Sequence, residues 1–354
     1  MKIITIVGAR PQFIKAATLS RAFRNYRIEE IIIHTGQHYD SNLSDIFFNQ
    51  MQIDKPKYFL EVKSKKHSEM TGKMMQKIEE ILISEKPNWV VLFGDTNSTL
   101  AGALAASKLH IKIAHVEAGL RSFNMKMPEE INRILTDRVS TLLFCPTKTA
   151  VNNLKSEGFE GYNCKVINAG DIMNEGIKFF STLAKKPLFE IDKNFILCTV
   201  HRPVNTDNVN NLKSIFKAVN YIGLGKQVVF PCHPRTLKVL KENNIDVSNI
   251  KMIEPIGYLE MVWLIKNCEL IITDSGGLQK ESYFFSKPCV VLRNETEWVE
   301  LVDNKFNALA GSDFELIIEY VKNYKFNYNY KLNLYGDGST SKIIIDSMLN
   351  NDLA

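Results

Sequence analysis

Short apolar runs alternate with amphipathic stretches along the first half of the chain. Runs of nearly all-apolar, often β-branched residues predict strands, and they lie at residues 3–7, 30–34, 89–93, 111–116, 141–144 and 165–168. Between them, apolar residues recur every three or four positions and predict helices, for example at residues 13–23, 69–84 and 99–109. Strands that are apolar on both faces are typical of parallel sheets covered by helices, so this half predicts an α/β fold.

The same alternation starts again after about residue 190. Predicted strands lie at residues 195–200, 227–230, 251–253, 270–273 and 289–292, and a final helical run at residues 342–349. The polar stretch 174–194 separates the two series. A chain of 354 residues has room for about two domains. We therefore expect two Rossmann-like domains.

Composition narrows the class of protein. With 45% apolar and 23% charged residues the chain is an ordinary globular one, and its net charge of +5 comes without the basic run typical of nucleic-acid binders. No apolar run is long enough for a signal peptide or a membrane span. The six cysteines form no C-x-x-C pair, which is the pattern of buried thiols in a reducing cytosol. We expect a cytoplasmic protein with no nucleic-acid or membrane partner.

Ligands of open parallel sheets bind at the carboxyl ends of the strands, so residues that follow each strand are the first candidates. The loop after residues 3–7 has one glycine instead of G-x-G-x-x-G, which argues against a nicotinamide site, but Arg10 and Lys15 would suit a phosphate or a sugar. Asp95 and Glu117 follow the strands at 89–93 and 111–116, in neighbouring loops of one sheet edge. Two acids there are costly unless they are solvated or functional. The alternative for Asp95 is a helix N-cap.

Glu130 lies in the first turn of a helix that follows the same loop. Pro128 and two acids at a helix start are also what helix stability alone favours, so only its position makes Glu130 a candidate.

In the second series, histidine and arginine follow two strands, at His201-Arg202 and at His233 with Arg235, and form a positive, titratable edge. Ser275-Gly276-Gly277 follows another strand and opens a helix whose free N–H groups suit a diphosphate, although it could be only a tight turn. Glu281 could accept hydrogen bonds from a ribose diol. His34 and His38 do not share a helix face and have no third partner, so we expect no metal.

At these residues the sequence resembles the non-hydrolysing UDP-N-acetylglucosamine 2-epimerase family, over nearly the whole chain. The motifs that carry the resemblance are GARPQFIK at 8–15, TGQHYD at 35–40, GDTNSTLAGALAA at 94–106, HVEAGLRS at 115–122, MPEEINR at 127–133, HPRT at 233–236, DSGGLQKE at 274–281, RNETEW at 293–298 and YGDG at 335–338.

The resemblance implies a glycosyltransferase-B-like fold: two Rossmann-like domains facing a cleft, with the C-terminal helix crossing back to the first domain. The expected boundaries are 1–170 with 340–354 for the first domain and 171–339 for the UDP-binding domain. No metal and no cofactor are implied. We also expect a homodimer.

The resemblance also distributes roles. The catalytic candidates are Asp95, Glu117, Glu130 and His201. The substrate-binding candidates are Arg10, Lys15, Arg121, Arg202, His233, Ser275, Gly276, Gly277, Glu281 and Arg293. Gln37 and His38 match a regulatory site where a second UDP-sugar acts as activator. The family commonly reads His-Arg-x-Glu-Asn, whereas Val204 stands here at the position of the glutamate.

The implied reaction is inversion at C2 of UDP-N-acetylglucosamine, giving UDP-N-acetylmannosamine for polysaccharide biosynthesis. The C2 proton is not next to a carbonyl, so the expected route is loss of UDP, removal of that proton to give a 2-acetamidoglucal, and re-addition of UDP. The wording of MPEEINR and RSFN leans toward the branch that acts on UDP-2,3-diacetamido-2,3-dideoxy-glucuronate. The rival functions are a hydrolysing epimerase, a glycosyltransferase of the same fold and a non-catalytic nucleotide-sugar sensor.

Overall fold

The computed structural model describes residues 1–37, 53–64 and 66–352, and the chain within it divides into two compact units. Unit 1 comprises residues 1–178 together with 333–354, and unit 2 comprises residues 179–332. The sequence analysis placed the domain boundaries at residues 170 and 339. In the structure, residues 171–178 and 333–339 group with unit 1.

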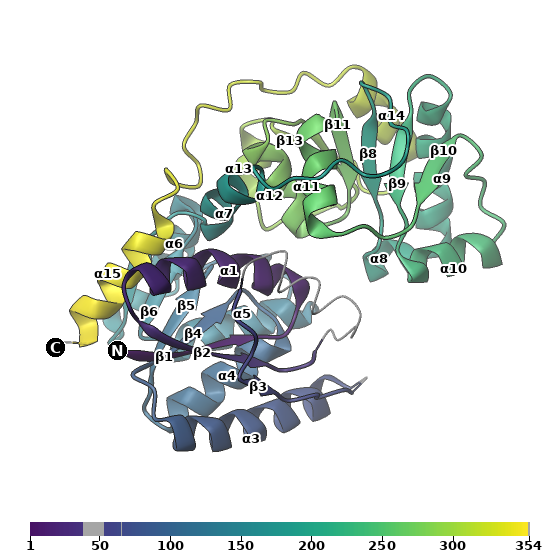
Figure 1. Cartoon of the computed structure of the whole chain (residues 1–354). Helices are drawn as coiled ribbons and strands as arrows, with labels where there is room; N and C mark the ends of the chain where they lie inside the picture. Colours follow the sequence, from purple (N-terminus) through teal and green to yellow (C-terminus); the bar gives the residue numbers. More distant parts are fainter. Residues whose placement is uncertain (38–52, 65, 353–354) are drawn as a thin grey trace. The chain divides into compact units, whose positions relative to one another are not determined.

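Unit 1 is a parallel sheet between helices (Figure 1). Among the described residues its strand order is β3-β2-β1-β4-β5-β6-β7, and all of the pairs are parallel. The strands are β1 (Lys2–Val7), β2 (Glu29–His34), β3 (Tyr58–Phe59), β4 (Trp89–Phe93), β5 (Lys112–Val116), β6 (Leu142–Cys145) and β7 (Lys165–Asn168). The helices are α1 (Arg10–Asn25), α3 (His67–Glu85), α4 (Asn97–Lys108), α5 (Pro128–Val139), α6 (Lys148–Ser156), η1 (Phe159–Gly161), α7 (Ile172–Phe180) and α15 (Thr340–Asp352).

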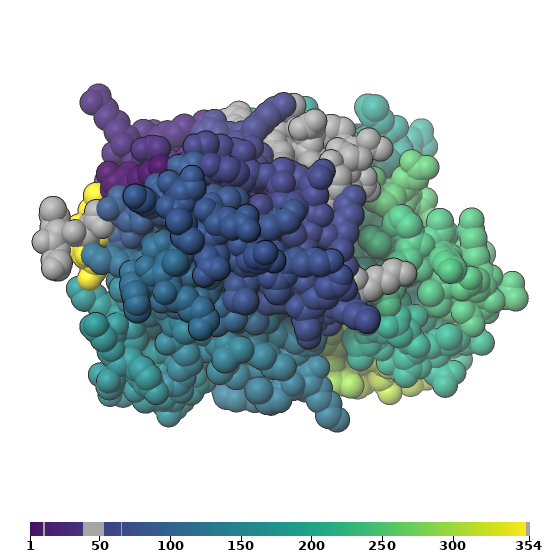
Figure 2. Space-filling view, turned by 90° about the horizontal axis from the view of Figure 1, so that it is seen from below, coloured from purple at the N-terminus to yellow at the C-terminus, as the bar shows by residue number. Residues whose placement is uncertain are grey.

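Helices cover both faces of this sheet, as apolar strands require. Helix α15, from the end of the chain, packs against α1 over one face, and α3 and α4 pack together over the other (Figure 1). The inner side of α3 places Met74, Ile78 and Leu82 in the core beside the strands. Its outer side chains, blue in the space-filling view, form much of the visible face of unit 1 (Figure 2).

Unit 2 repeats the architecture with a smaller parallel sheet, of order β10-β9-β8-β11-β12-β13 in the described part of the chain. The strands are β8 (Ile196–Thr199), β9 (Val228–Pro231), β10 (Ile250–Ile253), β11 (Leu270–Thr273), β12 (Cys289–Val291) and β13 (Asn307–Leu309). The helices are α8 (Pro203–Thr206), α9 (Val209–Gly223), α10 (Pro234–Glu242), α11 (Tyr258–Asn267), α12 (Gly276–Phe284), α13 (Val299–Asp303) and α14 (Phe314–Lys322). Separate apolar clusters pack on the two faces of this sheet.

Local sequence explains where the helices near the strand ends begin. Thr96 accepts a hydrogen bond from the backbone N–H of Thr99 and caps α4, and Ser275 caps α12 in the same way. The two-domain α/β fold predicted from the sequence is therefore confirmed. All six cysteines are free thiols, and five of them are buried. No helix of the described residues has the length and apolar character needed to cross a membrane.

Candidate active site

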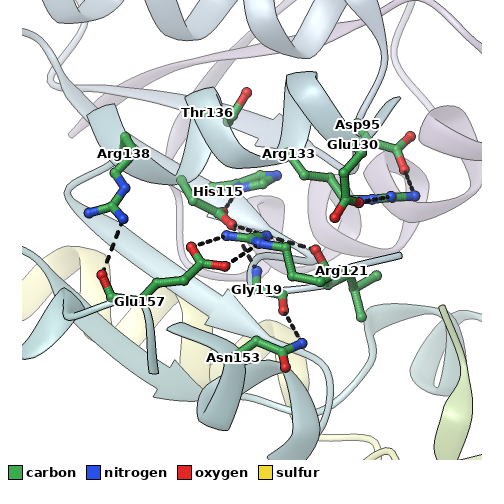
Figure 3. Close-up of polar contacts among 12 residues, drawn as sticks. Asp95, His115, Gly119, Arg121, Glu130, Arg133, Thr136, Arg138, Asn153 and Glu157 are labelled. Atoms are coloured by element: carbon green, nitrogen blue, oxygen red, sulfur yellow. Dashed lines mark hydrogen bonds and ion pairs between the residues drawn. The ribbon is translucent and has the colours of Figure 1, made fainter. Parts of the chain in front are cut away.

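The carboxyl edge of the unit 1 sheet brings the predicted acids together, and Figure 3 shows two of them, Asp95 and Glu130, beside Arg133. Asp95 lies between β4 and α4, and Glu117 follows β5, the neighbouring strand. A Cβ atom placed on Gly94 would stand 3.0 Å from Oε2 of Glu117, so the Glu117 carboxylate lies against the loop that carries Asp95. The two acids thus share one small region of the edge, as their positions after adjacent strands predict.

Glu117 has an unusual backbone conformation. Its φ of +77° is in the left-handed region, which a residue with a side chain adopts at a cost. Both its own N–H and that of Ala118 donate to the carbonyl of Phe144 at 3.1 Å, and these bonds fix the turn. Strained positions of this kind concentrate at functional sites, which supports Glu117 as a candidate.

Lys15 pairs with Glu117. Its ammonium group donates to Oε2, and the two side chains are only 9% and 10% exposed. The sequence offered Lys15 as a cation for the substrate. In the structure its charge is directed at Glu117 instead.

Glu130 lies deeper than the other two acids. Its side chain is 1% exposed and accepts hydrogen bonds from the backbone N–H groups of Ser122 and Phe123, from the Ser122 hydroxyl and from Arg133, at 2.8–3.0 Å. Burial by itself opposes ionisation, but these donors outweigh it and hold the pKa of Glu130 below its ordinary value. Glu130 therefore clamps the loop that follows β5.

Arg121 is not where the sequence placed it. Its guanidinium group is 1% exposed and donates to Asp137 at 2.8 Å and, through two nitrogens, to Glu157 at 2.7 and 2.9 Å (Figure 3). Asp137 also contacts His115 Nδ1 at 2.7 Å and accepts from the Gly119 N–H. The charge of Arg121, a substrate-binding candidate from the sequence, is therefore satisfied inside the protein by this buried network.

Three predicted residues of unit 1 are less informative. Gln37 accepts hydrogen bonds from the backbone N–H and the hydroxyl of Ser98 at 3.0 and 2.7 Å, so its amide oxygen is committed to the start of α4. His38 and the side chain of Arg10 lie outside the described residues.

The carboxyl edge of the unit 2 sheet is organised by Asp274, which sequence reasoning did not single out as a site residue. Asp274 is fully buried and accepts hydrogen bonds from the backbone N–H groups of His201 and Arg202 and from the Asn205 amide, at 2.9–3.1 Å. Its Oδ1 also lies 3.2 Å from Nδ1 of His201. The imidazole is thus supported by Asp274, while Val204 is exposed.

His201 is the titratable group of this edge, and its side chain is 43% exposed. Partial burial lowers the pKa of His201 from its ordinary value, with Asp274 opposing the shift and the nearby Arg202 and His233 adding to it. The ring is therefore mainly neutral at pH 7 and able to accept a proton. His233 caps α10, where its Nδ1 accepts from the Arg235 N–H.

The amino terminus of α12 forms the second part of this edge. A Cβ atom on Gly276 would stand 2.6 Å from Oε1 of Glu297 and 3.3 Å from a guanidinium nitrogen of Arg202, so a larger residue there would displace the Glu297 carboxylate. Arg293 holds Glu297 at 3.0 Å. Glu281 lies one turn further along α12, buried and within 3.3 Å of the Tyr258 hydroxyl. Free N–H groups, a helix dipole and a nearby arginine suit a phosphate group.

The arrangement offers no metal centre: in the described part of the chain, no three His, Cys, Asp or Glu side chains are grouped to hold an ion. Sequence reasoning missed Arg133, Asp137 and Asp274. Arg133 could have been found, because it lies three residues after Glu130 on a predicted helix and so on the same face.

Comparisons with known proteins give the family. A family model described as UDP-N-acetylglucosamine 2-epimerase matches residues 21–349. The chain is 53% identical to the UDP-2,3-diacetamido-2,3-dideoxy-D-glucuronate 2-epimerase of Pseudomonas aeruginosa over 322 residues, covering 90% of this chain and 91% of that one. It is 45% identical to a UDP-N-acetylglucosamine 2-epimerase of Methanococcus maripaludis, with coverage of 98% and 97%.

A solved structure has the same fold throughout. The crystal structure of Methanocaldococcus jannaschii UDP-GlcNAc 2-epimerase in complex with UDP-GlcNAc and UDP superposes with a TM-score of 0.90, at 42% identity, over 99% of this chain and 100% of that one. The paired acids of unit 1 and the glycine-rich helix start of unit 2 thus stand in a chain that is similar to these enzymes from end to end. The chain belongs to the UDP-N-acetylglucosamine 2-epimerase family and is an isomerase.

Proposed function

We propose that the protein is a non-hydrolysing epimerase that inverts C2 of a UDP-N-acetylhexosamine and converts UDP-N-acetylglucosamine into UDP-N-acetylmannosamine. The observation that carries the proposal is the placement of Asp95 and Glu117 on neighbouring strand ends, each held by its own cation. Inversion at a carbon requires a proton to leave from one face and return to the other, and two fixed carboxylates can serve two faces.

The chemistry follows from the sugar. As the bond between C1 and the diphosphate oxygen breaks, UDP leaves with the bonding electrons and positive charge develops at C1. A carboxylate takes the C2 proton, and the C2–H electrons form the double bond of a 2-acetamidoglucal. Proton delivery to the other face of C2 and re-addition of UDP to C1 complete the inversion, with no net change of atoms.

Asp95 and Glu117 are the proton-transfer groups in this proposal. Their side chains are 28% and 10% exposed, whereas Glu130 is 1% exposed and its oxygens already accept four hydrogen bonds. Glu130 orients the loop beside them. His201 is an additional proton carrier, since its lowered pKa leaves it free to accept.

Unit 2 has the complementary task of holding UDP while the sugar is detached from it. Ser275, Gly276 and Gly277 present the helix start to the diphosphate, with the Arg202 guanidinium beside Gly276. His233, Glu281 and Arg293 border this region and complete the proposed nucleotide site in unit 2.

A second candidate substrate is UDP-2,3-diacetamido-2,3-dideoxy-glucuronate, favoured by the 53% identity to the Pseudomonas aeruginosa enzyme of that name. Its carboxylate requires a cation. Two candidate cations of unit 1, Arg121 and Lys15, are already engaged with Asp137, Glu157 and Glu117. UDP-N-acetylglucosamine, which has no such group, therefore remains the first choice.

The test is to incubate the purified protein with each UDP-sugar at equal concentration and to separate the products. We expect the C2 epimer of UDP-N-acetylglucosamine with little free sugar. A preference above about a hundredfold for the uronate, near 2.7 kcal/mol of transition-state binding, would replace the substrate. Stoichiometric free hexosamine would indicate a hydrolysing epimerase, transfer to an added acceptor a glycosyltransferase, and binding without turnover a sensor.

Three further properties belong to the same proposal: a homodimeric assembly, a cytoplasmic location and activation by a second UDP-sugar near Gln37 and His38. Light scattering measures the assembly. Activation predicts that initial rates of UDP-N-acetylmannosamine conversion depend on added UDP-N-acetylglucosamine, whereas simple hyperbolic kinetics would remove the activator.

A further inference from the structure

Helix α5 presents one polar face to the carboxyl edge of the unit 1 sheet. Three polar residues near the start of this helix are buried: Glu130, Asn132 and Arg133. Asn132 donates to the backbone carbonyl of Asp95 at 2.9 Å and lies 3.3 Å from the Asn97 side chain. The helix thus fixes the main chain of the loop that carries Asp95.

Arg133 fixes the side chain of the same residue. Its NH2 group lies 2.6 Å from Oδ2 of Asp95, and its NH1 group donates to Oε2 of Glu130 at 2.8 Å (Figure 3). The guanidinium group is 5% exposed. Because its nitrogens are held in a rigid planar fork, one arginine sets the separation and orientation of the two carboxylates.

The result is a carboxylate with one oxygen held and one oxygen available. Oδ1 of Asp95 has no hydrogen-bond partner within the described residues, and the Asp95 side chain is 28% exposed. Glu130, by contrast, uses both of its oxygens inside the protein, on the loop that follows β5 and on Arg133. One anchored oxygen and one open oxygen is the geometry that proton transfer to a ligand requires.

We propose that Arg133 is a positioning residue for the C2 proton transfer: it anchors Oδ2 of Asp95 and directs Oδ1 at the substrate. This inference rests on the proposed epimerase function and assigns a role to a residue outside the predicted site. Glu130 is the second anchor, since its charge and its loop contacts hold the arginine in place.

The central test is a double-mutant cycle between Arg133→Met and Asp95→Asn. Arg133→Met lowers kcat about 10- to 100-fold with KM changed less than about threefold, because misplacing a reacting group by about 1 Å costs on this scale. If Arg133 acts through Asp95, the double variant turns over about as fast as Asp95→Asn alone. Multiplied losses in the double variant would show a general structural role and overturn the inference.

Two further variants keep the test decisive. Arg133→Lys retains a cation but lacks the planar guanidinium group, and it recovers about tenfold of the lost kcat. If Arg133→Met does not fold, Arg133→Lys replaces it in the double-mutant cycle with Asp95→Asn. Arg138→Met is the matched control: it removes a cation from the same helix, but Arg138 is exposed and its polar and ring contacts within the described residues are with Phe159, Tyr162 and the Glu157 carbonyl. It leaves kcat unchanged, and an equal loss there would overturn the inference.

An assay of the wild-type enzyme distinguishes a failure of the proposed function from a failure of the role assigned to Arg133. If the wild type produces no C2 epimer from either UDP-sugar, the proposed function fails. If the wild type is active and Arg133→Met keeps its full kcat, the proposed function stands and the role of Arg133 is wrong.

Discussion

The carboxyl edges of the two sheets are both organised by one buried aspartate, but the two aspartates are neutralised differently. Asp137 in unit 1 is satisfied by charged or titratable side chains, with Arg121 at 2.8 Å and His115 at 2.7 Å. Asp274 in unit 2 is satisfied mainly by neutral donors, the N–H groups of His201 and Arg202 and the Asn205 amide.

The difference explains what each edge has left for a ligand. Unit 1 uses its cations internally, since Arg121, Arg133 and Lys15 all pair with acids, and the result is a rigid set of carboxylates. Unit 2 uses backbone groups instead, and so the Arg202 guanidinium makes no hydrogen bond or ion pair with other described residues. Under the proposed function, the unit 1 edge fixes its carboxylates for proton transfer. The unit 2 edge has a positive charge that is unpaired within the described part of the chain and can bind an anion.

The largest effect on stability should come from replacing the buried aspartate of each edge by asparagine. Asp137→Asn lowers the free energy of unfolding by about 3 kcal/mol, because it removes one partner of a buried ion pair. Asp274→Asn costs about 1–2 kcal/mol, because the groups left unsatisfied are neutral. Urea unfolding measures both, with the exposed Asp192→Asn as a control expected within about 0.5 kcal/mol of wild type. Equal costs would remove the distinction between the edges.

The cost at Asp137 also has a pH dependence. Burial would raise the pKa of Asp137, but the hydrogen bond and charge of His115 and the charge of Arg121 outweigh it and hold the pKa below its ordinary value of 3.8. A lowered folded-state pKa stabilises the protein above the unfolded value, and this contribution is lost as the pH falls through the folded-state pKa. The stability difference between wild type and Asp137→Asn should therefore shrink below pH 3.8, and a constant difference would contradict the ionised state.

The next effect concerns turnover. Asp95→Asn and Glu117→Gln should each lower kcat about a hundredfold or more, the scale of a lost general acid or base. Glu130→Gln should retain more activity than either, because Glu130 acts on the loop. Glu129→Gln removes a charge from the same turn of α5 and serves as the control, with wild-type turnover expected. Normal kcat in Asp95→Asn would limit Asp95 to a structural role in its loop.

The smallest effect separates two adjacent glycines of the unit 2 edge. Gly276→Ala would drive a methyl group against Glu297 and Arg202 and should weaken UDP binding about tenfold, or 1.4 kcal/mol. A Cβ atom on Gly277 meets no atom within 4 Å, so Gly277→Ala should change UDP affinity less than about threefold. Isothermal titration with UDP measures both, and a reversed order would place the diphosphate elsewhere.

Much of the fold could be predicted from the sequence, because apolar strands that alternate with amphipathic helices indicate parallel α/β domains. The short strands β3 and β13 were missed, since two or three residues show no periodicity and are defined only by their neighbours. The C-terminal helix extends over Thr340–Asp352, beyond the helical run at 342–349. The apolar pattern did not reveal its two ends because they are polar.

The candidate site was predictable where strand ends determine position and not where side chains pair over long distances. Asp95 and Glu117 lie at one edge because adjacent parallel strands end together. Arg121 follows the same edge in sequence, yet its side chain turns toward Asp137 and Glu157, which are 16 and 36 residues further along the chain. Nothing in the local pattern distinguishes an arginine that faces a ligand from one that completes a buried network.

The most direct test of the central claim is proton NMR of UDP-N-acetylglucosamine with the wild-type protein in heavy water. If carboxylates of unit 1 remove and return the C2 proton while unit 2 holds UDP, deuterium appears at C2 of both epimers and little free sugar accumulates. Epimer formed without deuterium at C2 would contradict proton transfer at that carbon and, with it, the roles of Asp95 and Glu117.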